Sequence, residues 1–571
     1  MTNITIDGTQ KPWTQFYMPE QLDFDPENTE FERYIDIWDS AVASHGDRVA
    51  FSLVLQSGDI LEKTYKEMDR HITEMAAYLR HTQGLNEGDV LAIQLPNSIH
   101  YPIALLGAMR AGLTVTSINP MYSAREIVHQ LNDSGAKTLI GFNMFAGQIE
   151  KVQKQVALSQ IILAAPWEFF PFVTSNKIKF FLSNVQKAVP AINFAYEPFE
   201  GALKKGRKTK KTEFPILSIN SDSPAILQYT GGTTGVSKGA VLTHKNLTSC
   251  VSMTLTLSDR VLVTEEQVNI LTVLPLYHIF AFMLNLSISL CIGARNILIP
   301  NPRPLSNLKP AFDAYSVDWL TGVETLYAGL LTEKWFTKNP PAIKLSIAGG
   351  TALRPETERK WEALVGQICE GYGLTETACV VSFNIPDHTK KLGTVGIPTA
   401  GISIRIEDDD GNPVESGTPG HLLVKGANVT KEYLNRPEEA EKTFKGGWLS
   451  TGDIAVMDGN GYLSIVDREK DMILVSGFNV FPNEIENIIT EIEGVAEVAV
   501  IGIPHVKRGE APKAFVVANS GSLSQAQILN YCKEHLTAYK VPVEVEFMED
   551  LPKTIVGKVL RKELRNLKPA E

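Results

Sequence analysis

Short apolar runs that alternate with amphipathic helical patterns are the feature that most restricts how this chain can fold. Strand-like runs cover residues 90–95, 138–142 and 160–164, and helical spacing of apolar residues covers 65–83 and 124–134. Parallel strands require long crossover connections, which are usually helices. The alternation therefore predicts an α/β fold with largely parallel sheets. With 571 residues, the chain is long enough for more than one domain.

The pattern changes twice toward the C-terminus. Residues 392–467 contain short strand-like runs with turn pairs such as Asp410-Gly411 and Asn460-Gly461, which favours a small antiparallel or barrel-like subdomain. After Asp467 the pattern is typical of a compact α+β unit. Its helices are expected at 483–492 and 524–535, and its strands at 495–503 and 513–517. We therefore predict a domain of residues 1–466 followed by a domain of residues 467–571.

An uncharged stretch, residues 267–294, is long enough to cross a membrane. Pro275 divides it, however, and polar residues such as His278 and Asn285 interrupt it. We expect a buried strand at 269–274 and a buried helix at 279–292, because proline ends regular elements.

Composition excludes several classes of protein. The net charge of -11 argues against a dedicated nucleic-acid binder, which would carry a basic domain. The five cysteines are scattered and show no CxxC spacing, which argues against a disulfide scaffold or a thiolate zinc site. The N-terminus shows no secretion signal, so we expect a cytoplasmic protein.

The strongest local signal is a glycine- and threonine-rich segment that ends in a lysine, after a strand-like run at 225–229. Glycine lets backbone N–H groups converge on an anion, threonine adds hydroxyl donors, and lysine adds a positive charge. We therefore predict phosphate binding rather than an ordinary surface turn. Because the lysine precedes a glycine and follows Ser237, the spacing fails for a Walker A loop. The predicted phosphate-binding residues are Thr230, Gly231, Gly232, Thr233, Thr234, Gly235 and Lys238.

This segment resembles the phosphate loop of the adenylate-forming superfamily, which includes acyl-CoA synthetases, luciferases and peptide-synthetase adenylation domains. Further motifs of that superfamily follow in the same order, and the similarity spans nearly the whole chain. They are Leu274-Pro-Leu-Tyr-His-Ile-Phe280, Gly371-Tyr-Gly-Leu-Thr-Glu-Thr377, Thr451-Gly-Asp453, Asp467-Arg-Glu-Lys-Asp471 with Ser476-Gly477, and Pro552-Lys-Thr-Ile-Val-Gly-Lys558. Within the superfamily the chain is most similar to bacterial long-chain fatty-acid–CoA ligases. The resemblance implies a large N-terminal domain with two α/β sheets and a small β-rich subdomain, plus a small mobile α+β C-terminal domain.

The nucleotide residues follow from the same motifs. An aromatic ring can stack on a purine, a hydroxyl can contact phosphate, and a carboxylate can bind Mg²⁺ or a ribose diol. By itself, the motif at 371–377 could also be a buried turn with a satisfied glutamate, and turn capping would be the default explanation of Thr451-Gly-Asp453. The resemblance assigns Tyr372 to adenine, Thr375 to the α-phosphate, Glu376 to the metal and Asp453 to the ribose. It further implies nucleotide contacts for Gly349, Gly350, Thr351, Gly371, Gly373 and Arg468.

Lys558 precedes a basic segment that could simply be a solvated helix. The resemblance makes Lys558 the catalytic cation, which would offset charge on phosphorus as a carboxylate attacks. It also makes Lys470 the hinge of the C-terminal domain, and it assigns Ser476 and Gly477 to the pantetheine arm of CoA.

His278 has no Gly-x-Ser-x-Gly elbow near it, so a serine-hydrolase triad is disfavoured. The resemblance instead implies an acyl site formed by Tyr277 and His278, with Phe282 as a gate. Gly322 would leave room for the chain.

Residues 167–211 combine aromatic side chains, a helical pattern over 177–189 and a basic run. Six of the eight residues 204–211 are basic. An amphipathic helix next to a polybasic patch is typical of binding to anionic lipid, but a core-packed helix and a basic loop fit equally well. Peripheral attachment of the protein to the inner face of the cytoplasmic membrane is therefore a hypothesis.

The activity implied by the resemblance is a long-chain fatty acid–CoA ligase. Carboxylate and Mg²⁺-ATP give acyl-AMP and pyrophosphate, and CoA then displaces AMP. Three alternatives stay open: a fatty-acyl-AMP ligase serving a carrier protein, a medium-chain or aryl acid–CoA ligase, and a catalytically silent lipid-binding relative. The sequence does not indicate an oligomeric state, for which a homodimer is one candidate.

Overall fold

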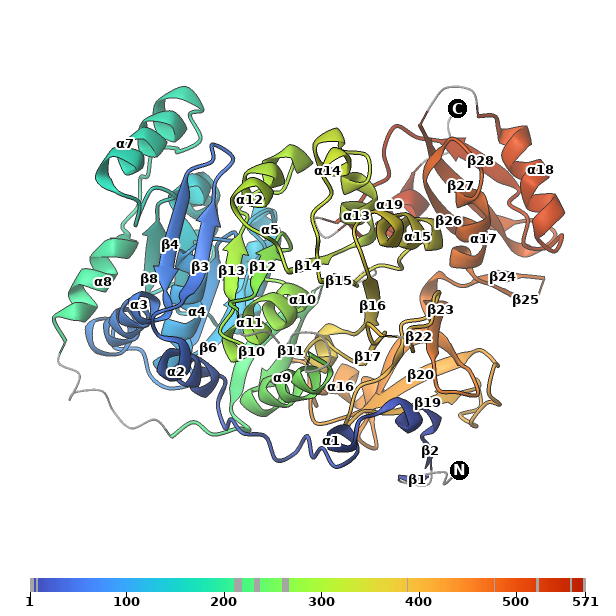
Figure 1. Cartoon of the computed structure of the whole chain (residues 1–571), viewed down its shortest axis with the longest axis horizontal. Helices are drawn as coiled ribbons and strands as arrows, with labels where there is room; N and C mark the ends of the chain where they lie inside the picture. Colours follow the sequence, from blue (N-terminus) through green and yellow to red (C-terminus); the bar gives the residue numbers. More distant parts are fainter. Residues whose placement is uncertain are drawn as a thin grey trace.

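The computed structural model describes residues 5–6, 9–209, 218–230, 237–258, 266–387, 389–476, 478–519, 523–554 and 557–567. Two sheets with their helices form the body of the molecule, a β-rich subdomain follows, and the C-terminal region lies at one end (Figure 1). This arrangement confirms the predicted α/β class.

The first sheet is parallel except at one edge, where β10 and β11 pair antiparallel. The expected strands at 138–142 and 160–164 are found with the same bounds. In spatial order the strands are β11 (Lys238–Thr243), β10 (Pro224–Thr230), β6 (Thr114–Ser117), β5 (Val90–Gln94), β7 (Thr138–Phe142), β8 (Gln160–Ala164) and β9 (Glu197–Pro198).

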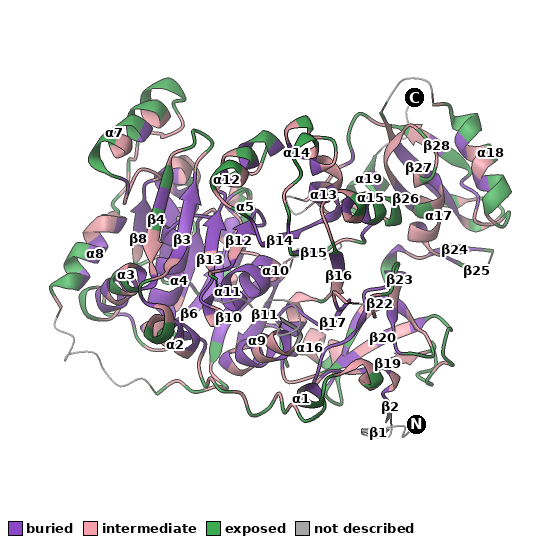
Figure 2. Cartoon of the chain, in the orientation of Figure 1, coloured by how far each residue is buried: buried purple, intermediate pink, exposed green. Residues whose placement is uncertain are grey.

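The second sheet is parallel in its centre and antiparallel at both edges. Its central strands are buried, as expected for strands covered on both faces (Figure 2). In spatial order they are β18 (Ile397–Pro398), β17 (Ser382–Phe383), β16 (Ile368–Tyr372), β15 (Leu345–Ala348), β14 (Trp319–Gly322), β12 (Asn269–Thr272), β13 (Arg295–Leu298), β3 (Val49–Val54) and β4 (Ile60–Thr64).

Helices join the two sheets into one hydrophobic core. Helix α3 (Tyr65–Ala77) packs on β3 and β4, whereas α4 (His100–Arg110) packs on β5, β6 and α3. Helix α4 is therefore buried along nearly its whole length. The surrounding helices are α2 (Tyr34–His45), α5 (Ala124–Ser134), α6 (Ala146–Gln153), α8 (Phe199–Arg207), α9 (His244–Ser258), α12 (Lys309–Ala314), α13 (Glu324–Leu330), α14 (Lys334–Lys338) and α15 (Pro355–Leu364).

The uncharged stretch forms a core strand and helix, as predicted. Strand β12 ends before Pro275, and a continuous helical segment of α10 (Ile279–Ala281), a π-helical part (Phe282–Ser287) and α11 (Ile288–Cys291) follows. Among the described residues, no helix combines the length and the apolar character needed to cross a bilayer.

The β-rich subdomain is antiparallel, as its turn pairs predicted. It contains β19 (Ser403–Glu407), β20 (Gly420–Lys425), β21 (Phe444–Lys445), β22 (Trp448–Met457) and β23 (Leu463–Arg468).

The C-terminal region has its own hydrophobic core, in which residues such as Ile485, Val500 and Ile528 are buried. The predicted boundary between 466 and 467 falls within β23 and stays a prediction. The elements of this region are β24 (Ile473–Val475), β25 (Phe478–Val480), α17 (Pro482–Thr490), β26 (Val495–His505), β27 (Gly509–Ala518), α18 (Gln525–His535), β28 (Glu544–Phe547) and α19 (Arg561–Asn566).

The helix predicted at 177–189 differs from the structure. Helix α7 (Phe172–Phe180) begins five residues earlier, and a π-helical turn, Phe181–Val185, ends the helical segment. Ile178 is buried, whereas Phe181 and Val185 are exposed, so the single apolar face expected from spacing is divided. The spacing rule assumes a regular helix, which the π-helical turn interrupts.

Candidate active site

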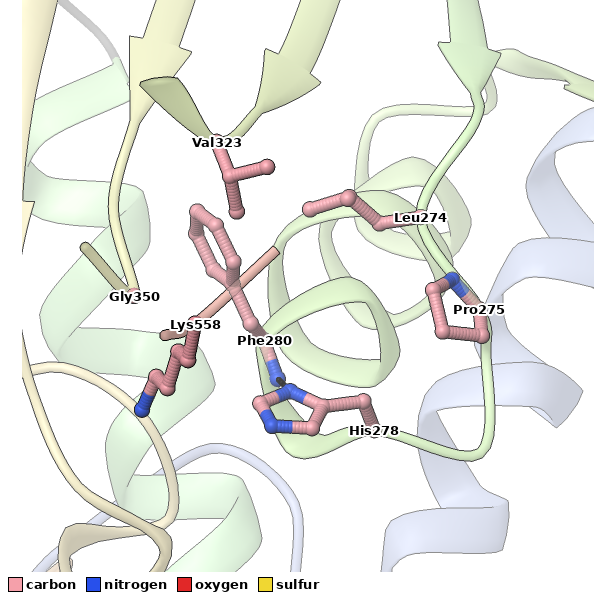
Figure 3. Close-up of a pocket in the computed structure, with 7 residues that line it drawn as sticks. All are labelled: Leu274, Pro275, His278, Phe280, Val323, Gly350 and Lys558. Atoms are coloured by element: carbon pink, nitrogen blue, oxygen red, sulfur yellow. Dashed lines mark hydrogen bonds between the residues drawn. The ribbon is translucent and has the colours of Figure 1, made fainter. Parts of the chain in front are cut away.

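A small pocket lies beyond the carboxyl ends of β14 and β15, where open α/β sheets usually bind ligands. Figure 3 shows the Phe280 ring in its middle and the side chain of Lys558 beside Gly350. The C-terminal region therefore contributes a residue to a pocket formed by the large sheet. The lining residues are Leu274, Pro275, His278, Phe280, Val323, Gly350 and Lys558.

The predicted adenine segment follows β15 and forms one wall of this pocket. A Cβ atom at Gly349 would lie 2.9 Å from Cζ of Phe280, so a larger residue there would displace the ring. Gly350 has a φ of +77°, which favours glycine. Thr351 accepts a weak hydrogen bond (3.4 Å) from the backbone N–H of Glu324.

The predicted adenine and ribose residues form one connected group. The Tyr372 hydroxyl donates to Oδ2 of Asp453 at 2.5 Å, and Nε of Arg468 lies 2.7 Å from Oδ1 of the same carboxylate. Strand pairing explains the second contact, because β22 and β23 place Asp453 directly opposite Arg468. Burial raises the pKa of Asp453, and the Arg468 charge acts in the opposite direction.

Neighbouring atoms also lie close to Gly371 and Gly373, the two glycines that flank Tyr372. A Cβ at Gly371 would lie 3.0 Å from the Phe383 ring, and one at Gly373 would overlap the Cys379 carbonyl oxygen. Gly373 therefore requires glycine for space, whereas a side chain at Gly371 would require the Phe383 ring to shift. Thr375 and Glu376 follow in a short 3-10 turn.

Lys558 reaches the pocket from the loop before α19. Burial, together with the nearby Arg468 charge, lowers the pKa of its ammonium to about 8. His278 lies on the other side of the same pocket, and its pKa is lowered to about 4 by burial and by the Lys558 charge. A neutral imidazole and a weakly held proton on lysine are therefore expected near neutral pH.

Tyr433 connects the phosphate segment to the predicted metal residue. Its hydroxyl donates to Oε1 of Glu376 at 2.7 Å, and Nζ of Lys238 lies 5.4 Å from its ring centre. Lys238 also pairs with Glu439 at 2.7 Å. Sequence reasoning missed Tyr433, which lies outside every motif. Its place follows from the approach of the Tyr433–Leu434 segment to β11, where Leu434 donates to the Gly239 carbonyl.

Both ends of the predicted phosphate segment are fixed. Ser237 Oγ donates to the Thr230 carbonyl at 2.6 Å, and His129 donates to the Ser237 carbonyl at 2.9 Å. Gly231, Gly232, Thr233, Thr234 and Gly235 lie outside the described residues.

Comparison with known families identifies this arrangement. A family model described as "AMP-binding enzyme" matches residues 38–434, and one described as "AMP-binding enzyme C-terminal domain" matches residues 484–558. The chain belongs to the AMP-binding enzyme family.

Individual relatives cover nearly the whole chain. A long-chain-fatty-acid–CoA ligase from Yersinia pestis is 40% identical over 98% of this chain and 98% of its own length. A feruloyl-CoA synthase from an Amycolatopsis species is 31% identical over 88% of this chain and 93% of its own. Among solved structures, ATP-bound MatB from Rhodopseudomonas palustris is 28% identical, with a TM-score of 0.79 over 93% of this chain and 98% of that one.

Of the four residues predicted for the acyl site of this AMP-binding enzyme, only His278 lines the pocket. The Phe282 ring stacks on Tyr34 in the core, with 5.1 Å between ring centres. Gly322 ends β14 and packs against Leu326 and Tyr327. Tyr277 accepts a hydrogen bond at its carbonyl from Gln228. Phe280, two residues before the predicted gate, lines the pocket instead.

Of the two predicted CoA residues, Ser476 is not among the residues that line the pocket. Ser476 is exposed on the turn between β24 and β25, a hairpin that lies on the side of the C-terminal region nearest β23 (Figure 1). Gly477 lies outside the described residues. Lys470 lies in the short turn Glu469–Asp471, directly after β23, and burial lowers the pKa of its ammonium.

No cluster of three metal-ligating side chains occurs in the described part of the chain. A single carboxylate such as Glu376 still suits Mg²⁺, which is commonly held by one or two carboxylates together with substrate phosphates. The site is therefore compatible with a magnesium ion that arrives with a nucleotide.

Proposed function

We propose that this chain is an AMP-forming long-chain fatty acid–CoA ligase, with ATP and CoA as co-substrates. The observation that carries the proposal is Lys558, which comes from the C-terminal region and lines a pocket beside Gly350. A half-buried cation in the same pocket as Gly350 suits a reaction that builds negative charge on phosphorus. The name of the Yersinia relative and its coverage of both chains support the acyl class.

In the first half-reaction the fatty-acid carboxylate attacks the α-phosphorus of ATP. An O–P bond forms, the bond to the bridging oxygen breaks, and pyrophosphate leaves with its electron pair. Tyr372 would stack on adenine, Asp453 would accept from the ribose hydroxyls, and Lys558 would offset the charge of the pentavalent phosphorus. Glu376 would hold Mg²⁺, which neutralises phosphate charge.

In the second half-reaction the CoA sulfur attacks the carbonyl carbon of acyl-AMP, and AMP leaves. Ser476 does not line the pocket in this arrangement, so the C-terminal region would turn to deliver the pantetheine arm. Lys470, at the junction after β23, is the proposed hinge. Residues 1–466 would form the adenylation domain, and residues 467–571 would form the mobile domain.

The proposal is tested by measuring AMP release from ATP with carboxylates of two to eighteen carbons and with cinnamate, each with and without CoA. We expect turnover with palmitate or oleate that requires CoA. Lys558→Ala should lower acyl-AMP formation by at least about 100-fold, the usual scale for a group that stabilises a transition state. Lys562→Ala, an exposed lysine on α19, is the matched control and should keep wild-type turnover.

Other outcomes separate the alternatives. Palmitoyl-AMP without a thioester would identify a ligase for a carrier protein. Turnover confined to cinnamate or to medium chains would identify an aryl or medium-chain acid–CoA ligase. Absence of AMP with every acid would identify a lipid-binding relative without catalysis.

We further propose that the α7 segment attaches the enzyme to anionic membranes at the cytoplasmic face. Large apolar side chains are exposed there, including Phe172 (83% exposed), Phe180 and Phe181. Two exposed lysines lie between them: Lys177, which pairs with Asp59 at 3.1 Å, and Lys179. On α8 the basic residues pair with carboxylates: Lys204 with Glu200, Lys205 with Glu197 and Arg207 with Glu74. The exposed apolar side chains of the α7 segment therefore support membrane attachment more directly than the basic residues of 204–211 do.

A further inference from the structure

The segment after β14 meets the C-terminal region beside the pocket. Val323 lines the pocket together with Lys558. Gly557, next to the lysine, has a φ of +79°, and a Cβ there would lie 2.8 Å from Oγ1 of Thr325. The loop that carries Lys558 thus rests directly on this segment.

Arg354 makes a second connection to the C-terminal region. It precedes α15, and its Nη1 donates to the Ala496 carbonyl on β26 at 3.1 Å. Its Nε donates to Oε1 of Glu324 at 2.8 Å, and its backbone N–H donates to Oε2 at 3.1 Å. One guanidinium therefore joins β26 to the residue between Val323 and Thr325.

Glu324, at the inner end of this connection, is buried and hydrogen-bonded on both carboxylate oxygens. The Glu324 side chain is 7% exposed, and Thr357 donates a further hydrogen bond to its Oε1 at 2.7 Å. Burial raises the pKa of Glu324, and the Arg354 charge opposes that shift. A buried carboxylate needs such partners, so Glu324 holds the guanidinium in a fixed position. The other end of the connection is the hydrogen bond from Arg354 to the Ala496 carbonyl oxygen. This hydrogen bond would break if the C-terminal region turned.

We propose that Arg354 is a positioning residue that docks the C-terminal region in the orientation that inserts Lys558 into the pocket. Arg354 is absent from the pocket lining and acts through the Ala496 contact. The inference rests on the proposed two-step ligase reaction. It requires that Arg354 supports acyl-AMP formation and contributes nothing to the attack by CoA, for which the contact must break.

The test is Arg354→Lys, with the half-reactions measured separately. Lysine keeps a positive charge beside Glu324 and lacks the second nitrogen arm that reaches Ala496. Acyl-AMP formation is followed in a single turnover with ATP and palmitate without CoA. Thioester formation is followed from synthetic palmitoyl-AMP and CoA. We expect the first rate to fall about tenfold, as for the loss of one hydrogen bond from a charged donor, and the second to stay unchanged.

Two controls keep a positioning role apart from a structural one. Arg359→Ala, an exposed arginine on α15, should leave both rates unchanged. In a Lys558→Ala background, Arg354→Lys should cause no further loss of acyl-AMP formation, because there is no lysine left to position.

Equal losses in both half-reactions, or an unchanged rate of acyl-AMP formation, would overturn the inference. A further tenfold loss in the Lys558→Ala background would also overturn it. If wild type makes no acyl-AMP but still converts palmitoyl-AMP to the thioester, the proposed first step fails, and the inference fails with it. Normal wild-type activity with no effect of Arg354→Lys would overturn the inference alone.

Discussion

The ionisation of Lys558 sets how acyl-AMP formation should depend on pH. Burial and the Arg468 charge lower its pKa to about 8, so the cation predominates below that pH and is lost above it. We expect kcat/KM for ATP in the first half-reaction to be level at lower pH and to fall about tenfold per pH unit above 8, because this ratio reports ionisation in the free enzyme.

Lys558→Arg provides the comparison for this profile. A guanidinium stays charged throughout the range, so the variant should be slower but should lose the fall above pH 8. The exposed-lysine variant Lys562→Ala should keep the wild-type profile. A level wild-type profile up to pH 10 would contradict the assignment.

Gly557 is the second position where one residue controls the first half-reaction. Gly557→Ala would place a methyl group against Thr325 and would strain a backbone with φ of +79°. We expect acyl-AMP formation to fall about 5- to 160-fold, since strain of this kind costs about 1–3 kcal/mol. Thioester formation from palmitoyl-AMP should persist.

Gly494→Ala is the control that separates the effect of backbone strain from the effect of the clash with Thr325. Gly494 has a φ of +95°, but no atom lies within 4 Å of the position its Cβ would take. This variant should lower the thermal midpoint without selectively slowing acyl-AMP formation. Equal rate losses in the two variants would show that backbone strain, not docking on Thr325, is responsible.

At the scale of elements, the exposed apolar surface of the α7 segment predicts membrane binding that can be tested by mutation. Replacing Phe180 and Phe181 with serine should lower the partition constant for anionic liposomes, measured by co-sedimentation, by about 100-fold or more, because each buried aromatic side chain contributes about 1.5–3 kcal/mol. Turnover with a soluble medium-chain acid in the absence of lipid should not change. High salt should weaken wild-type binding if the neighbouring lysines contribute.

The control for α7 is Leu392→Ser, which removes an apolar side chain that is 54% exposed in another part of the molecule. Its co-sedimentation should match wild type. If wild type does not bind anionic liposomes, or if the Phe180 and Phe181 variant binds as wild type does, the membrane proposal is wrong.

At the scale of the whole molecule, the C-terminal region has a hydrophobic core of its own. We therefore expect that destabilising this core abolishes catalysis while nucleotide binding persists. Ile528 is fully buried in that core, and Ile528→Ala should cost about 2–5 kcal/mol of its stability. We expect acyl-AMP formation to fall as temperature rises, while ATP affinity measured by calorimetry persists, because Tyr372 and Asp453 precede residue 467. Val506→Ala, at a fully exposed position, is the control. Loss of ATP binding in Ile528→Ala would mean that the two regions fold as one unit.

Much of this architecture can be predicted from local sequence. The strands at 138–142 and 160–164 and the helix at 124–134 occur with the predicted bounds, because alternating and helical spacing reflect burial within one element. The pairing of Tyr372 and Arg468 with Asp453 connects residues from three predicted motifs.

Tertiary structure decided the contacts that no local pattern encodes. Tyr433 reaches Glu376 across 57 residues of sequence, and Arg354 reaches Ala496 across 142. Phe280 rather than Phe282 lines the pocket, because the helical turn directs the second ring toward Tyr34. Local sequence patterns specify the fold class and the residue types that are available for chemistry. The packing of sheets and C-terminal region determined which of those groups meet, since side chains from distant segments approach only after the elements that carry them have packed.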